Sequence, residues 1–166
     1  MVRAFMISFL ARQALTRPRE EMAARHPHPW LVWEPGAWTA PSPTTRMTLL
    51  PPEPGAEKPV QGDSLCFELV LKADQKGLRV GRDQGCDIVI NDATVSRSHL
   101  LLITEGEAWV ALVSPSSRGA MAGGVAIEPG ARFTLLPDMP IQLGEVQLTF
   151  HDRDGFLTRV VNESNK

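Results

Sequence analysis

The stretch "GRDQGCDIVINDATVSRSH", residues 81–99, decides the fold. It begins with a Gly-Arg pair, continues through the short apolar run "CDIVI" and an Asn-Asp turn, and ends on Ser96 and His99. A short apolar run between turn residues is typical of a buried strand. The stretch therefore predicts a strand between two polar loops, with an arginine before it and a serine after it.

The segments on either side of this stretch have the same character. Short runs of strand-forming residues alternate with Gly, Pro and Asp turns, and 114–124 has loop composition. No helical period appears after residue 60, so we predict an all-β sandwich. The expected strands are 64–71, 77–82, 86–90, 99–104, 108–113, 131–136, 140–144 and 146–151.

The spacing of Gly81–Arg82 and the Ser-x-x-His from Ser96 to His99 resembles that of the forkhead-associated (FHA) domain family. "WVALVSPSSRGAMAGGVAI" resembles the family's tryptophan-containing strand and following loop, and "IQLGEVQLTF" its closing hairpin. The resemblance covers about residues 64–152. It implies an FHA-like β-sandwich of about eleven short strands, which binds phosphothreonine peptides on loops at one end.

The resemblance assigns a phosphate-binding role to Arg82 and Ser96, with Arg97 as a helper. These residue types suit the chemistry, because a guanidinium offers two parallel donors to phosphate and a hydroxyl adds another. Gly81 and His99 take structural positions: the glycine permits close approach, and the histidine ring is expected to be buried and to brace the binding loop.

The loop "SPSSRG" departs from the family pattern at one position. Thr94 falls where the family reads the third residue after the phosphothreonine, Ser117 falls where it carries Ser or Thr, and Gly119 is structural. Arg118 stands where the family has an asparagine that holds the peptide main chain. Arginine only donates hydrogen bonds, so Arg118 is expected to add charge near the phosphate instead.

An enzyme is the weaker interpretation of Ser96 and His99. A serine hydrolase also needs an orienting acid, an oxyanion hole and often a Gly-x-Ser-x-Gly elbow, and "TVSRSH" contains no such elbow. No phosphate-cradling nucleotide motif is present either. We therefore predict no catalytic residues and no cofactor.

The composition of the 166 residues excludes several other classes of function. The net charge is −2 and the pI about 6.1, which lacks the basic excess expected of a nucleic-acid-binding protein. Cys66 and Cys86 form no CxxC motif, and His26 and His28 have no third ligand nearby, so no metal site is predicted. No apolar run is long enough to span a membrane.

The first 61 residues are expected to form an N-terminal extension. An amphipathic helix is predicted over about 3–24, in preference to a signal peptide, and a Trp/Pro-rich arm and linker over 25–61. The tryptophans Trp30, Trp33 and Trp38 favour an arm that packs over the domain or binds a partner. The predicted FHA-like domain is 62–154, followed by a C-terminal tail at 155–166.

The expected function is that of a cytoplasmic adaptor that binds Thr-phosphorylated proteins, either kinase substrates or a kinase, in Ser/Thr-kinase signalling. The alternative is a scaffold that uses a diverged FHA domain for phosphate-independent assembly. A serine hydrolase using Ser96 is a distant third.

Overall fold

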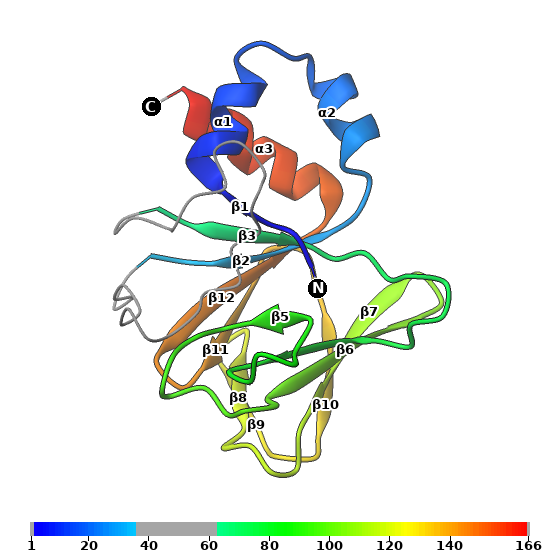
Figure 1. The fold of residues 1–166 in the computed structure, drawn as a ribbon, viewed down its shortest axis with the longest axis vertical. Helices are drawn as coiled ribbons and strands as arrows, with labels where there is room; N and C mark the ends of the chain where they lie inside the picture. The colour runs from blue at the N-terminus through cyan, green and yellow to red at the C-terminus, as the bar shows by residue number, and fades with distance from the viewer. Residues whose placement is uncertain (1, 36–62, 166) are drawn as a thin grey trace.

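The computed structural model describes residues 2–35 and 63–165. Two β-sheets pack face to face, and three helices cover the outer face of one of them (Figure 1). The larger sheet has the order β1-β3-β2-β12-β11-β8-β9 and the smaller one β10-β7-β6-β4-β5. All paired strands are antiparallel except β4 and β5.

The larger sheet consists of β1 (Ala4–Met6), β2 (Trp30–Trp33), β3 (Leu65–Glu68), β8 (Ala120–Ala122), β9 (Val125–Ile127), β11 (Met139–Leu143) and β12 (Val146–His151). The smaller sheet consists of β4 (Leu78–Gly81), β5 (Ile88–Val89), β6 (Leu100–Glu105), β7 (Ala108–Val113) and β10 (Arg132–Leu135). The helices are α1 (Ile7–Ala14), α2 (Arg19–Arg25) and α3 (Arg153–Ser164). The predicted strands are thus present, and β1, β2, β8 and β9 add to them.

Strand β2 contributes to two hydrophobic cores. Side chains alternate across a strand, so Leu31 and Trp33 face the core between the sheets, whereas Trp30 and Val32 face the core beneath the helices. All four are at most 3% exposed. This double burial explains why "WLVW" is apolar at every position.

The N-terminal segment is therefore part of the sandwich and differs from the predicted extension. Strand β2 pairs with β3 on one side and β12 on the other, so it is an interior strand of the larger sheet. The single helix predicted over about 3–24 is replaced by β1, α1 and α2. Helix α1 ends at Ala14, and Pro18, which has extended backbone, caps the start of α2. Trp38 and the predicted linker lie outside the described residues.

The predicted C-terminal tail forms most of helix α3, contrary to the expectation that no helix follows residue 60. Asp152 caps this helix by accepting a hydrogen bond from the backbone N–H of Gly155 at 2.7 Å. Phe156 and Val160 are each 1% exposed and pack into the core beneath the helices. The Phe156 ring stacks on Trp30 with 4.2 Å between centroids.

A charged network joins α3 to the larger sheet. The guanidinium of Arg159 donates two hydrogen bonds to the carboxylate of Glu34, at 2.6 and 2.5 Å. The same carboxylate accepts a hydrogen bond from the hydroxyl of Thr149. Arg159 also donates to Nε2 of His151, whose Nδ1 bonds Asp138. The C-terminal helix is thus held by polar contacts as well as by apolar packing.

The described residues contain neither a membrane-spanning helix nor a metal-binding cluster. No helix among them is long and apolar enough to cross a membrane. No group of three or more His, Cys, Asp or Glu side chains among them is placed to hold a metal ion.

Candidate functional site

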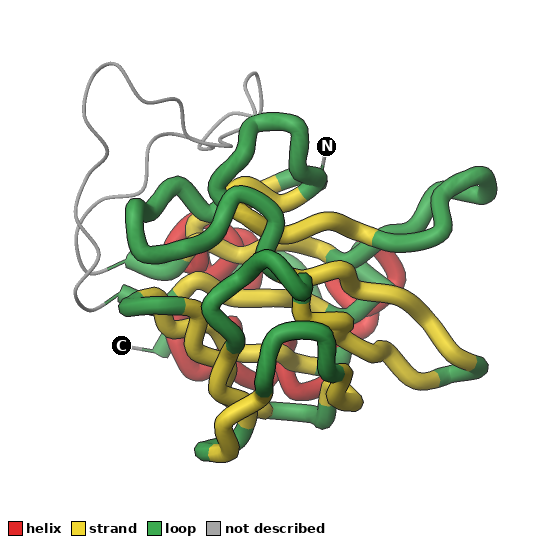
Figure 2. The backbone as a smooth tube through the Cα atoms, turned by 90° about the horizontal axis from the view of Figure 1, so that it is seen from below, coloured by secondary structure: helices red, strands yellow, loops and turns green. Residues whose placement is uncertain are grey.

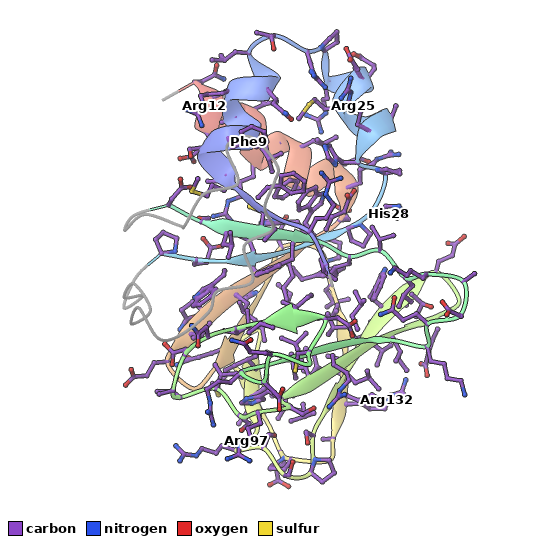
Figure 3. The ribbon with its side chains drawn as sticks, viewed as in Figure 1. Phe9, Arg12, Arg25, His28, Arg97 and Arg132 are labelled. Atoms are coloured by element: carbon purple, nitrogen blue, oxygen red, sulfur yellow. The ribbon has the colours of Figure 1, made fainter. Side chains whose placement is uncertain are left out.

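Three loops meet at the end of the molecule away from the helices. They follow β4, connect β5 to β6, and connect β7 to β8, and they surround a pocket of about 320 Å³. Figure 2 looks at the molecule from this end and shows loops in front of the strands. Figure 3 places Arg97 at this end and Arg12 among the helices at the other. The pocket is lined by Arg82, Ala93, Thr94, Val95, Ser96, Arg97, Ser98, Ser116 and Arg118.

Gly81, the last residue of β4, lets two of these loops approach each other closely. A Cβ at this position would overlap the backbone carbonyl of Arg97. The backbone N–H groups of Arg82 and Asp83 donate to the carbonyl oxygens of Ser96 and Arg97, each at 3.0 Å. The close approach made possible by Gly81 is therefore between two segments of the chain, and it sets Arg82 beside Ser96.

Three exposed arginines line the pocket without an acidic partner. The Nε of Arg82 donates to the carbonyl of Val95 at 3.0 Å, which orients its guanidinium and leaves the two Nη groups for other acceptors. Neither Arg97 nor Arg118 forms a side-chain hydrogen bond within the described residues, and no carboxylate of those residues pairs with any of the three. The pocket therefore gathers positive charge in a chain whose net charge is negative.

His99 links two walls of the pocket from inside the protein. Its side chain is fully buried, its Nδ1 accepts from the backbone N–H of Ser96 at 3.1 Å, and its Nε2 lies 2.6 Å from the carbonyl oxygen of Gly119. Since a carbonyl only accepts and a backbone N–H only donates, the ring is the neutral tautomer with its proton on Nε2. Burial lowers the pKa of His99, more than the bond to the Gly119 carbonyl raises it.

These contacts exclude a nucleophile–base pair in this structure. Both ring nitrogens of His99 are engaged with the backbone, so neither is available to the hydroxyl of Ser96. A base must lie within hydrogen-bonding reach of the proton that it removes. The Ser96 hydroxyl instead lines the pocket beside the arginines.

The two peptide-contacting hydroxyl residues predicted from the sequence are both engaged within the protein. The Thr94 hydroxyl donates to the carboxylate of Asp92 and accepts from the backbone N–H of Glu145, and the Thr94 backbone N–H also donates to Asp92. Ser117 is 9% exposed and does not line the pocket; its hydroxyl donates to Ser114 and accepts from the backbone N–H of Gly119.

Four lining residues were missed in the sequence: Ala93, Val95, Ser98 and Ser116. Ala93, Val95 and Ser98 are neighbours in "DATVSRSH" of predicted site residues, so their position in the chain was the signal that could have identified them. Ser116 belongs to "SPSS", whose turn composition gave no indication of which serine faces the pocket.

A family model matches residues 61–154, and its description is the cytoplasmic domain of the inner membrane component of type III secretion systems. The chain belongs to this family. The match covers more than half of the chain, and its description agrees with the predicted cytoplasmic location. No curated protein matches the chain.

A solved structure shows that the fold is that of an FHA domain. The FHA domain of the CT664 protein from Chlamydia trachomatis is 22% identical, with a TM-score of 0.50 over 75% of this chain and 97% of that one. The N-terminal FHA domain of Rad53p from S. cerevisiae, solved with a phosphothreonine peptide, is 21% identical, with a TM-score of 0.43 over 51% of this chain and 73% of that one. FHA domains are non-catalytic binding modules, and the chain has this fold.

Proposed function

We propose that this chain binds phosphothreonine-containing segments of other proteins, the products of Ser/Thr kinases, in the pocket lined by Arg82, Ser96 and Arg97. One observation carries the proposal: exposed arginines and hydroxyl side chains converge on one pocket, and no described carboxylate neutralises them. The lining offers little apolar surface to an apolar ligand, since Ala93 and Val95 are its apolar residues.

The chemistry of the lining suits a phosphate monoester. Such a group carries about −1.5 to −2 charges at neutral pH and three acceptor oxygens. Arg82 is held by its Nε and presents both Nη groups, which matches the paired donors that bind phosphate in a bidentate manner. Ser96 and Arg97, adjacent on a loop fixed by backbone hydrogen bonds, supply a hydroxyl and a second guanidinium.

Titration of a phosphothreonine peptide library and its unphosphorylated twin against Arg82→Ala tests the proposal. We expect binding to depend on the phosphate and to weaken in the variant by about 1.5–3 kcal/mol, the scale of one charge-assisted hydrogen bond. Arg12→Ala removes the same charge at the far end of the molecule (Figure 3) and should leave binding unchanged. Equal binding of the two peptide sets would refute the proposal.

The family match favours a second candidate function, in which this domain assembles with other components of a secretion apparatus through phosphate-independent contacts. The same titration separates the two functions. Under the second candidate, Arg82→Ala leaves partner binding unchanged and phosphorylation of the peptides has no effect.

A further inference from the structure

The charge of the pocket exceeds what one phosphate can balance. Arg82, Arg97 and Arg118 all line it, and each carries a permanent positive charge. A phosphothreonine side chain supplies about −1.5 to −2 charges. With a single phosphate bound, at least about one positive charge therefore stays unmatched at the site.

Nearby carboxylates do not supply the missing negative charge. The carboxylate of Asp83 accepts from the backbone N–H of Gly85, and that of Asp92 accepts from the backbone N–H and the hydroxyl of Thr94. These acids stabilise loop turns and pair with no arginine of the pocket. The pocket can therefore accept an additional anion from the ligand.

Arg118 is the arginine best placed to receive that anion. It belongs to the loop between β7 and β8, whereas Arg82 and Arg97 belong to the other two loops. Its loop is fixed on both sides of Arg118, because the Ser117 hydroxyl accepts from the N–H of Gly119 and His99 bonds the Gly119 carbonyl. The Arg118 side chain thus extends from a different loop than Arg82 and Arg97, and hydrogen bonds fix that loop in place.

The chemistry of arginine specifies what Arg118 can bind. It has five donors and no acceptor, so it cannot receive a peptide N–H, and its planar fork fits a carboxylate or a phosphate. An asparagine at this position would be neutral and would both donate and accept. The charge of Arg118 therefore alters which ligands the pocket favours.

We propose that the ligand carries a second anionic group, a carboxylate or a further phosphate, within about two residues of the phosphothreonine, and that Arg118 binds it. Two residues of extended chain span about 7 Å, which keeps both anions within one small pocket. The inference rests on the proposed phosphothreonine binding and adds a preference for acidic neighbours.

The test starts from a phosphothreonine peptide whose neighbouring residues are uncharged, called the neutral peptide. A second set carries one Glu, placed in turn at each of the two positions on either side of the phosphothreonine. A third set carries phosphoserine at the same positions. Wild type should bind the best acidic peptide about three- to fivefold more tightly than the peptide with uncharged neighbours, the upper part of the range expected of a partly exposed charge pair. In Arg118→Asn the gain should fall below about twofold, with binding of the neutral peptide largely retained. The Glu and phosphoserine arms show which anion Arg118 prefers.

Arg12→Asn is the matched control, because it changes the net charge equally at the opposite end of the molecule (Figure 3) and should keep the full acidic gain. Equal affinity of wild type for neutral and acidic phosphopeptides overturns the inference and leaves phosphothreonine binding standing. An unchanged acidic gain in Arg118→Asn, or an equal loss for all phosphopeptides, also overturns it. Binding that ignores the phosphothreonine refutes the proposed function, and the inference with it.

Discussion

Replacing His99 by leucine should destabilise the whole domain, because it removes both hydrogen bonds by which the ring joins the loop of Ser96 to the loop of Gly119. Leucine is close to histidine in size, so little cavity forms. The backbone N–H of Ser96 and the carbonyl of Gly119 each lose a partner. Leaving the buried Gly119 carbonyl without a partner costs about 1–3 kcal/mol, and the half-buried Ser96 N–H costs less, so the loss in free energy of unfolding should be about 1–4 kcal/mol.

The same substitution should change how stability depends on pH. Burial lowers the pKa of His99 in the folded protein, so the unfolded chain takes up the proton first as the pH falls. The stabilisation from the neutral ring is complete above the ordinary histidine pKa of 6.5 and is lost as the pH falls through the lower folded value. Wild type and His99→Leu should therefore differ less at pH 5 than at pH 7.5.

Urea unfolding followed by tryptophan fluorescence measures both effects, since Trp30 and Trp33 are buried and report on the cores. The control is His28→Leu, because His28 has no side-chain hydrogen bond within the described residues and lies away from the pocket. A loss below about 1 kcal/mol at pH 7.5, less than the cost of a single unsatisfied group, would refute the bracing role of His99. So would a difference that stays constant between pH 7.5 and 5.

Three further substitutions test other contacts. Gly81→Ala should push the Arg97 carbonyl away, lowering both melting temperature and phosphopeptide affinity, with a stability loss of about 1–3 kcal/mol. Trp30→Ala should cost about 3–5 kcal/mol in urea unfolding, because this ring is fully buried against the helices. Burial raises the pKa of Glu34, but its bonds to Arg159 and other groups lower it more, so the net pKa is lowered. Wild type should therefore lose stability as the pH falls below about 4.5. Melting curves of Glu34→Gln should lack that part of the pH dependence.

The sequence predicted the sandwich and most of the pocket because the signals for both are local. Short strands between turn residues are visible as alternating or apolar runs. The segment from Gly81–Arg82 to Ser96 is short and contains only β5 and the loops on either side of it. The pocket is lined by Arg82, Ser96 and Arg97, which the spacing of that segment relates to one another, and by Arg118 from the loop between β7 and β8. Ser117 is absent from the lining because its hydroxyl stabilises its own turn.

The placement of the N-terminal segment could not be predicted in the same way. "WLVW" indicates burial on both faces, yet nothing local to it specifies pairing with Leu65–Glu68 and with a strand more than a hundred residues later. Proline on either side pointed to an extended arm. Helix α3 was missed for a different reason: its few apolar positions give a weak period, and its start depends on the single cap at Asp152.

The pocket also shows why net charge is a poor guide to the ligand of this chain. Several arginines away from the pocket are paired with acids: Arg159 with Glu34, and Arg132 with Glu105. The aspartates on the pocket loops bond mainly to backbone N–H groups instead. An anion that binds this pocket in the folded chain and does not bind the unfolded chain stabilises the fold. The small excess of acidic residues that gives the acidic pI thus coexists with local positive charge where an anionic ligand can use it.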